Sequence, residues 1–363
     1  MAALVVRQWL MPVEGKDAVI FPPTYPIAED KAGYNIDYFE DDKTNVCQID
    51  SVGSQANRME PLFKREKYRH LVPQVVIRAG DRKIDLLDAG HRAADAIVRF
   101  STLGPELHEA FLAYRDEGNA EPLARIAPTS IVFGSWDSRA TQARLPRIVR
   151  SVIRAYNVRP LTRSAQYSTI AGEILDAGDV QTTTKGPKAE LGLAHVPAVR
   201  THGGVLVDGE IRREAIVNLT SLRSLAGRSE EETLTLRRYI LGLALIGFTA
   251  PLEPCLREGC ELVPDPAKNA KWEEVRYDGT RVGLSIGHDE ALAYATAAAA
   301  SFGARDPVEA SFDADLAMQV LNLKEDDRKK LLRQGPVTAE ALSQLQARGA
   351  AASRKGRNAK DVE

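Results

Sequence analysis

Residues 138–172 contain seven arginines and neither aspartate nor glutamate. On a helix, like charges three or four residues apart cost about 0.2–0.5 kcal/mol per pair, and no acid within the segment offsets that cost. A folded chain must therefore leave these arginines in solvent, pair them with acids from elsewhere, or give them a polyanion. This choice constrains the fold more than any other feature of the sequence.

The first half of this segment separates into two sides when it is placed on a helical wheel at 100° per residue. The apolar side holds Leu145, Ile148, Val149, Val152, Ile153 and Tyr156, and the basic side holds Arg144, Arg147, Arg150 and Arg154. Pro146 is tolerated at the start of a helix. The pattern predicts a helix with a stripe of guanidinium groups. Because arginine forks fit phosphate oxygens, nucleic acid is one natural partner; a solvated or internally paired face is the alternative.

Net charge restricts how such a partner could bind. The chain has 363 residues with 48 Lys+Arg against 50 Asp+Glu, a formal net charge of −2. That excludes a uniformly basic nucleic-acid binder and allows a locally basic one. With 44% hydrophobic and 27% charged residues, the composition is that of a globular protein. The length allows two domains, or one core with large insertions.

Residues 50–60 (DSVGSQANRME) form a second candidate segment. On a predicted helix, one face holds Ser51, Ser54, Asn57 and Arg58, and the opposite face holds Val52, Ala56 and Met59. Two hydroxyls, an amide and a guanidinium suit contacts to phosphate and sugar. Helix capping by the serines, with internal hydrogen bonds from the other two, explains the same residues equally well.

Two further segments carry polar groups. In LTRSAQY (161–167), Arg163 and Gln166 are donors and Tyr167 offers a ring on which a base could stack, or a core side chain. Residues 177–204 lack a clear period and are predicted to leave the core as a long loop that contains Lys185 and His195. Such a loop could close over a nucleic-acid strand or be an ordinary surface loop.

The remaining pattern predicts an α+β protein. Hairpins are expected around 79–81, 208–209 and 278–279, and helices over 89–103, 106–117, 229–248 and 289–302. Residues 130–134 are expected to form a buried strand. Residues 27–46 read as a loop, and residues 336–363 as a flexible tail.

Signals for other classes of protein are weak. No nucleotide-binding, zinc-protease or serine-hydrolase motif is present, and three cysteines fit a reducing cytoplasm better than a disulfide framework. We expect no metal, no cofactor, no export and no membrane span. Metal-free cleavage of RNA by His195 and Lys185 is the one enzymatic alternative that the residues suggest.

Four blocks, in this order, resemble one family: FPPTYP (21–26), DSVGSQANRMEP (50–61), the long run 133–167, and LREGCELVP (256–264). They look like the backbone subunit of the type I-G (earlier I-U) CRISPR surveillance complex, Cascade, in the "Cas-seven" group of RAMP proteins. The resemblance extends over about residues 4–300. It implies an RRM-like (ferredoxin-like) palm over residues 1–335 with inserted finger and thumb elements, the thumb at 177–204.

The resemblance also implies a function and its partners. Several copies would assemble head to tail along one CRISPR RNA, support pairing of the guide with a target DNA strand, and contact other Cascade subunits, a large subunit and one that caps or processes the guide end. Type I relatives are generally binders and not nucleases, although an aspartate in related type III subunits cuts RNA. Asp176 and Asp179 precede the candidate thumb without matching that motif. Cleavage of guide or target RNA through the 177–204 loop is therefore the alternative function.

The resemblance supports two residue groups. Thr141-Gln142 with Arg144 and Arg147 is similar to a motif that grips guide RNA, and Asn57-Arg58 to an Asn-Arg pair in the same relatives. The complete predicted RNA-binding set is Ser51, Ser54, Gln55, Asn57, Arg58, Arg139, Thr141, Gln142, Arg144, Arg147, Arg150, Arg154, Arg163, Gln166, Tyr167, Lys185 and His195. Because spacer sequences vary, such a subunit should grip phosphate and 2′-OH groups and ignore base identity.

Overall fold

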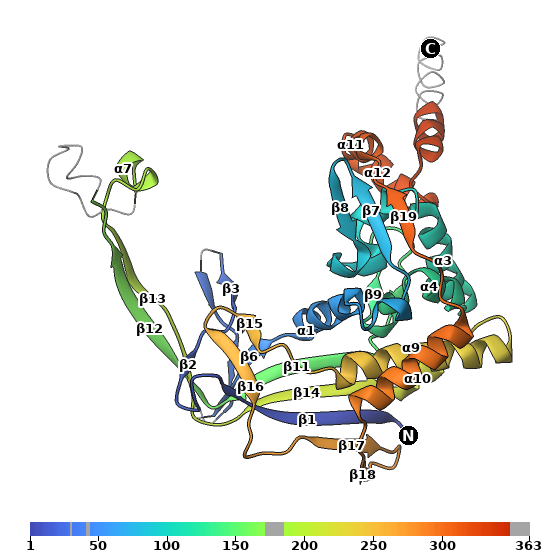
Figure 1. Cartoon of the computed structure of the whole chain (residues 1–363). Coiled ribbons are helices and arrows are strands. Elements are labelled where there is room, and N and C mark those ends of the chain that lie inside the picture. The colour runs from blue at the N-terminus through green and yellow to red at the C-terminus, as the bar shows by residue number, and fades with distance from the viewer. Residues whose placement is uncertain (30, 41–43, 171–184, 349–363) are drawn as a thin grey trace.

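A curled antiparallel sheet with helices on one side forms the centre of the molecule (Figure 1). The computed structural model describes residues 1–29, 31–40, 44–170 and 185–348. The main sheet has the order β15-β16-β1-β14-β11-β6-β5, and β17 pairs with the same side of β1 as β16 and also with β18. The class is therefore mixed α+β, as the sequence predicts.

The strands of the described residues are β1 (Ala3–Pro12), β2 (Val19–Ile20), β3 (Thr24–Ala28), β4 (Lys31–Tyr34), β5 (Ile36–Tyr38), β6 (Asn45–Asp50), β7 (Val75–Ala79), β8 (Arg82–Asp85), β9 (Ser135–Trp136), β10 (Arg144–Leu145), β11 (Val149–Tyr156), β12 (Val158–Tyr167), β13 (Val196–Val207), β14 (Ile211–Asn218), β15 (Cys255–Arg257), β16 (Cys260–Pro264), β17 (Lys271–Val275), β18 (Arg281–Gly283) and β19 (Val308–Ser311).

The α-helices of the described residues include α1 (Val52–Met59), α2 (Ala96–Arg99), α3 (Gly104–Glu117), α4 (Glu121–Ile126), α5 (Pro128–Val132), α7 (Pro187–Glu190), α8 (Leu219–Arg223), α9 (Glu230–Thr249), α10 (His288–Phe302), α11 (Ala314–Leu321) and α12 (Glu325–Gln334). Short 3₁₀ helices cover Glu60–Lys64, Arg69–Leu71, Leu86–Asp88 and Arg92–Ala94.

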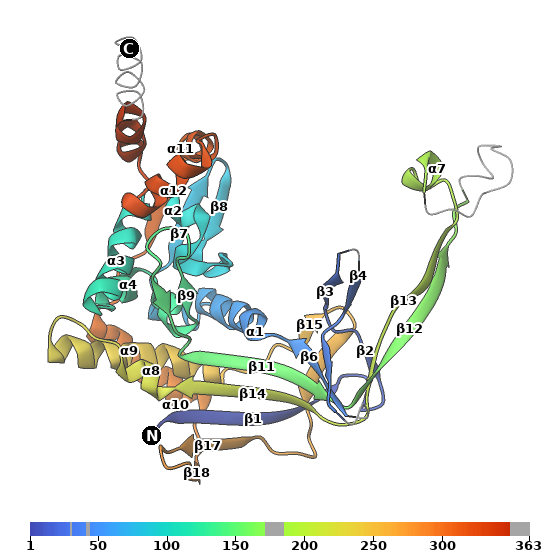
Figure 2. The same cartoon turned by 180° about the vertical axis from the view of Figure 1, so that it is seen from behind.

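Helices α9 and α10 cover one face of the sheet (Figures 1 and 2). The Ser229 side chain caps α9 by accepting a hydrogen bond from the Glu232 amide, as the sequence predicts. Gly242 of α9 lets the two helices approach closely, because a Cβ there would lie 2.8 Å from the Ala295 Cα. The Tyr239 and Phe302 rings stack at 4.5 Å between centroids. This packing forms the main core.

The predicted helix over Arg144–Tyr156 is wrong. The segment forms the two-residue strand β10 and the eight-residue strand β11, which pairs with β14 on one side and β6 on the other. Val149, Ser151, Ile153 and Ala155 share one buried face of β11; Val149 belongs to the main core, and Ile153 and Ala155 to a second apolar cluster formed by strand residues. β-branched residues favour strands, and both neighbouring strands provide ladder hydrogen bonds that an isolated surface helix would lack.

Of the other predicted hairpins and helices, some are confirmed and some are wrong. The hairpins β7–β8 and β17–β18 and the helices α3, α9 and α10 are confirmed. Residues 89–103 form 3₁₀ turns and the four-residue α2 instead of one helix, since the backbone is extended at Ala89 and Asp95. Residues 130–134 are buried but belong mainly to α5, which Pro128 starts. β13 and β14 do not pair with each other around Asp208-Gly209, because they join different sheets.

A long two-stranded arm projects from the sheet (Figure 1). It consists of β12 and β13, which lie between β11 and β14 in the chain and pair with each other. At its base, β13 also pairs with β2 through Val205 and Ile20. The second hairpin, β3–β4, stands beside it and occupies part of the region 27–46, which the sequence predicts as a loop.

The carboxyl-terminal part forms a small separate apolar cluster. Leu316, Val320, Leu331, Val337 and Leu342 are buried together. The expected flexible tail begins at residue 336, yet Val337 and Leu342 are in this cluster and residues 339–348 are helical. Residues 349–363 lie outside the described part of the chain.

Candidate nucleic-acid interface

The arginines of the acid-free segment lie in several places and not on one helix. Arg139 is in the turn between β9 and β10, Arg144 is on β10, and Arg147 follows it. Arg150 and Arg154 share one face of β11, because side chains two and four residues apart on a strand point the same way. Arg163 is exposed on the arm. The segment thus supplies cations to three surfaces.

The first surface, the loop face, is made of Asn57, Arg92, Trp136, Arg144 and Arg147. The buried Arg92 guanidinium donates from Nη2 to Asn57 Oδ1 at 3.1 Å and from Nη1 to the Gly134 carbonyl oxygen at 3.3 Å. Arg147 packs against Gly134, whose φ of +78° and missing Cβ leave space for the Arg147 Cγ. Arg144 lies over the exposed Trp136 ring, 5.7 Å from its centroid. These contacts hold two exposed guanidinium groups beside α1.

Charge at the loop face is not balanced locally. Burial and then the neighbouring Arg92 guanidinium lower the pKa of Arg147, although an arginine stays protonated. Glu60 forms an ion pair with Arg92 at 2.7 Å, and both side chains are buried. Burial raises the pKa of Glu60 to about 7, and Arg92 opposes that rise. An anion placed over the loop face would relieve the repulsion between Arg92 and Arg147.

Hydrogen bonds to Asp137 organise the turn before β10. The Thr141 amide and Oγ1 both donate to Asp137 Oδ2 at 2.8 Å, and Arg99 donates to Oδ1 at 2.9 Å. Burial of Asp137 acts to raise its pKa, but the hydrogen bonds and the Arg99 charge outweigh this and lower it. The sequence predicts that Thr141 contacts RNA. Its side chain is buried, so it shapes the turn from inside and does not face a ligand. Arg139 and Gln142 are the exposed members of the turn.

Helix α1 is anchored by several of the residues predicted to bind RNA. The Gln55 side chain is buried; its Nε2 donates to Asp50 Oδ2 at 2.6 Å, and its Oε1 accepts from Ser151 Oγ at 2.7 Å. Arg58 donates to Asp50 at 3.0 Å and to the Leu256 carbonyl oxygen. Gln55 is therefore internal, and the expectation that it faces a ligand fails because both ends of its amide are already bonded.

The two serines of this helix match the capping alternative. Ser51 Oγ accepts from the Ser54 amide at 3.2 Å at the start of α1, and both serines are partly exposed. Asn57 is exposed beside the loop face. Of the predicted polar face of α1, Ser51, Ser54 and Asn57 are thus reachable from solvent.

On the arm, Arg163, Gln166 and Tyr167 are all exposed, and Tyr167 is 63% exposed. Tyr167 is therefore a surface residue, and the alternative that it belongs to the core is wrong. His195 Nδ1 accepts a hydrogen bond from the Thr169 amide at 3.2 Å. Lys185 is exposed near the end of the arm. Asp176 and Asp179 lie outside the described residues.

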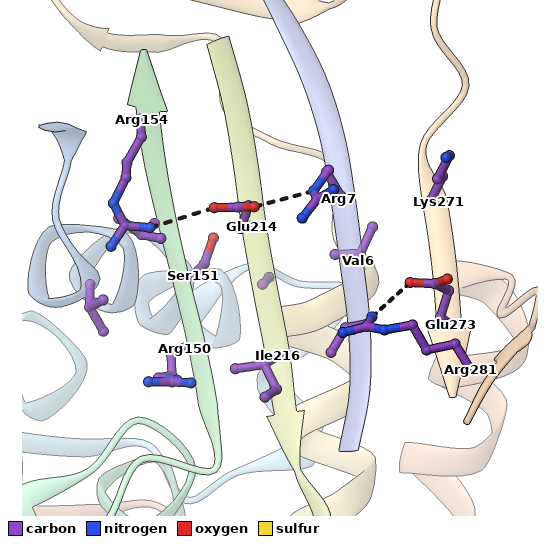
Figure 3. A pocket seen from close by; sticks show the side chains of 14 residues that line it. Val6, Arg7, Arg150, Ser151, Arg154, Glu214, Ile216, Lys271, Glu273 and Arg281 are labelled. Carbon is purple, nitrogen blue, oxygen red and sulfur yellow. Dashed lines mark hydrogen bonds and ion pairs between the residues drawn. The ribbon is translucent and has the colours of Figure 1, made fainter. Parts of the chain in front are cut away.

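The third surface, the sheet face, is the side of the sheet away from α9 and α10 (Figures 2 and 3). Its charged residues are Arg7, Arg150, Arg154, Glu214, Lys271, Glu273 and Arg281. They line an open trough of about 630 Å³. Arg7 contacts Glu214 at 3.2 Å and Arg154 contacts the same carboxylate at 3.5 Å.

Comparison with known families adds an independent observation. The family model described as CRISPR-associated protein GSU0053 matches residues 4–160. The match indicates a CRISPR-associated protein. No curated protein matches this chain. The matched residues include α1, the loop face and β11, and they end within β12.

Features of two other classes of protein can be checked in the described residues. Among the described residues, no group of three or more His, Cys, Asp or Glu side chains is arranged to hold a metal ion. No helix in the part of the chain that the structure describes is long and apolar enough to cross a membrane.

Sequence reasoning missed Arg92 and much of the sheet face. Arg7 is far in the chain from Lys271 and Arg281 and comes near them only through strand register, in which Arg7 lies opposite both Glu214 and Lys271. Strand alternation over residues 3–12 could have placed Arg7 on an exposed face. Arg92 has no comparable signal, because its backbone φ of +53° follows from the surrounding fold.

Proposed function

We propose that this chain is a non-catalytic CRISPR RNA-binding backbone subunit of a type I-G Cascade complex. In this proposal the loop face and the arm hold the sugar–phosphate chain of the guide. One observation carries it: Arg139, Arg144, Arg147 and Arg163 are exposed, and no acidic side chain of the described residues forms an ion pair with any of them.

The chemistry of these groups fits a guide whose sequence varies. Guanidinium forks bind phosphate oxygens and carry no base preference. Asn57 and Ser54 on α1 add an amide and a hydroxyl, Gln142 in the turn before β10 adds a second amide, and all three are at least partly exposed. Tyr167 on the arm provides a ring on which an unpaired base can stack.

The topology supports the palm expected from the resemblance. Strands β17, β1, β14 and β11 lie in this order and all pairs are antiparallel. In the chain, helix α1 lies between β1 and β11, and helix α9 lies between β14 and β17. This order is compatible with the β-α-β-β-α-β ferredoxin-like motif that we propose, with the arm inserted between β11 and β14. In the proposal the arm is the thumb and β3–β4 belongs to the finger.

The proposed partners follow from the same role. Further copies would assemble head to tail along the guide, a contact that propagates and does not close. With a net charge of −2, neighbouring copies would repel each other little. A target DNA strand would pair with the held guide, and other Cascade subunits would sit at the two ends.

Retention of guide RNA tests this function. The protein is co-expressed with a CRISPR array, purified, and its bound RNA is quantified. Replacing two phosphate contacts by carboxylates should weaken binding at least about 100-fold, so Arg144→Glu with Arg147→Glu should purify without guide. A matched control is Lys330→Glu with Arg333→Glu on α12, where the same charge change leaves the loop face untouched. Equal guide content in both variants would contradict the proposal.

The absence of catalysis needs its own experiment. Guide-loaded protein is incubated with complementary labelled RNA, with and without magnesium. Under the proposal the RNA stays intact. Regular cleavage that disappears in His195→Ala or Asp179→Ala would replace the proposal with the ribonuclease alternative.

A further inference from the structure

The sheet face is an open trough that the guide-binding proposal does not use (Figure 3). Its lining comes from β11, β14, β1, β17 and β18, and the trough reaches Val52 at the start of α1. Arg150 and Arg154 point into it, whereas Ser151 between them points to the other side of β11 and donates to Gln55. The trough and the anchored side of α1 therefore lie on opposite faces of β11.

Charge in the trough is mostly positive. Five cations, Arg7, Arg150, Arg154, Lys271 and Arg281, face two carboxylates, Glu214 and Glu273. The lining therefore carries a net charge of three positive units. Such an excess on a concave surface raises the local concentration of anions.

The acids orient some of these cations without neutralising them all. Glu214 lies between Arg7 and Arg154 and contacts both, and Glu273 accepts from Arg281 at 2.9 Å. No acid in the described part of the chain forms an ion pair with Arg150 or Lys271. Because exposed ion pairs contribute only about 0–1 kcal/mol, an incoming phosphate can replace a carboxylate at little cost.

We infer that the sheet face binds the phosphate backbone of a single-stranded nucleic acid other than the guide. The inference rests on the proposed function, in which the guide occupies the loop face and the arm. Cations on β11, β1 and β17 extend across three strand spacings, about 14 Å. Several consecutive phosphates cover that length.

The composition of the trough favours nucleic acid over an acidic protein. Centres of protein–protein interfaces are depleted in charged residues and enriched in aromatic residues and methionine. The trough has seven charged side chains, its apolar residues are aliphatic, and its described lining contains no aromatic residue or methionine. Protein–nucleic acid interfaces are more polar and more positive. The Trp9 ring centroid lies 5.9 Å from Lys271 Nζ and the Tyr156 hydroxyl donates to Glu214, but neither ring is in the trough lining, so we expect recognition of the backbone that is independent of sequence.

The test uses guide-loaded, full-length protein and a labelled single-stranded DNA with no complementarity to the guide. Arg7→Glu with Lys271→Glu changes the net charge of the sheet face from plus three to minus one. We expect at least a tenfold loss of affinity for the probe, with the amount of retained guide unchanged. Comparing the affinity for this probe with that for a labelled single-stranded RNA of the same length shows whether the trough prefers a DNA or an RNA backbone.

Controls separate the possible causes. Lys330→Glu with Arg333→Glu should bind the probe like the wild type. Arg7→Glu with Lys271→Glu changes two paired residues of β1 and β17 and could disturb that pairing. Arg150→Glu lies on β11, at the other side of the trough, and should reproduce the loss of probe affinity without touching that pair. Unchanged probe affinity in both trough variants, or no binding by the wild type, would overturn the inference.

Two further outcomes would also overturn it. Loss of guide from the trough variants would mean that the trough holds the guide itself. Displacement of the probe by poly-glutamate as effectively as by unlabelled single-stranded DNA of equal charge would mean that the trough takes an acidic protein. Guide retention by the variant Arg144→Glu with Arg147→Glu would instead contradict the proposed function. The effect of the trough variants on probe affinity could still be interpreted in that case.

Discussion

The loop face and the sheet face receive arginines from the same acid-free segment, but their neighbours differ. On the sheet face, β14 and β17 place Glu214 and Glu273 among the cations. On the loop face, the acid Glu60 lies below the surface and pairs with Arg92, so Arg144 and Arg147 have no carboxylate partner among the described residues. The comparison teaches that strand register can bring acids from elsewhere to part of an acid-free segment and leave another part of it without a carboxylate partner.

This difference predicts that the loop face depends on a ligand more than the sheet face does. At the loop face, the one ion pair among the described residues joins Glu60 to Arg92, and further relief of the like charges needs an external anion. At the sheet face, internal ion pairs already relieve part of the repulsion. Each prediction below changes one of these two balances.

The largest effect is expected when an acid is added to the loop face. Asn57→Asp keeps the shape of the side chain and turns its contact with Arg92, now 3.1 Å from Oδ1 to Nη2, into an ion pair. Guide affinity should fall about tenfold or more, since a like charge then faces the phosphates. The free energy of unfolding should stay equal or rise. Filter binding and chemical denaturation measure the two quantities, and Asn57→Ala is the neutral control.

Space for Arg147 gives the next prediction. Gly134→Ala places a Cβ 2.6 Å from Arg147 Cγ and forces a residue with φ of +78° into strain. The free energy of unfolding should fall by about 1–2 kcal/mol, and guide affinity should fall with it. Gly118→Ala is a matched control, because its φ is +71° and no atom lies within 4 Å of the added Cβ. An equal loss of guide affinity in both variants would contradict the prediction that Gly134 places Arg147 for guide binding.

Glu60 predicts a pH dependence beneath the loop face. Its pKa is raised to about 7 in the folded protein, so between about 4.5 and 7 the folded state binds more protons at this site than the unfolded state. This group's contribution to stability therefore falls as pH rises through that window. Relative to the wild type, Glu60→Gln should gain on the order of 1 kcal/mol per pH unit there and level off above pH 7. A difference that does not change with pH would rule out the raised pKa.

The smallest effect is expected from removing an acid at the sheet face. Glu214→Gln takes away the carboxylate shared by Arg7 and Arg154. Affinity for a non-complementary single strand should rise about two- to fivefold at low salt and lose that gain at high salt, because the change is electrostatic and exposed. Fluorescence anisotropy at two salt concentrations measures it. Weaker binding would show that Glu214 mainly orients the arginines.

Local signals were sufficient to predict some of the fold. The Ser229 cap of α9 and Gly303 after α10, which has φ of +72°, mark helix ends within a few residues. The β11 error has a specific cause. Ser151 is polar yet buried, and Val152 is apolar yet lies on the sheet face, so the strand alternation is hidden and the apolar residues fit a helical period.

Prediction of the site has the same limit. Exposed Arg144, Arg147 and Asn57 were predicted from sequence, since exposure of charge needs no long-range information. The interior roles of Gln55 and Thr141 depend on Ser151, Asp50 and Asp137 reaching them in the folded chain. The sheet face joins residues from Arg7 to Arg281 through strand register, which a single sequence does not reveal.

The salt dependence of guide dissociation tests the central claim most directly, that acid-free arginines at the loop face hold the guide by its phosphates. Arg144→Gln with Arg147→Gln removes two charges and leaves the rest of the chain unchanged. For a single strand, each lost phosphate contact reduces the slope of log affinity against log salt by about 0.7. The slope of the double variant should therefore be about 1.4 smaller than that of the wild type. Identical slopes in the two proteins would contradict the account.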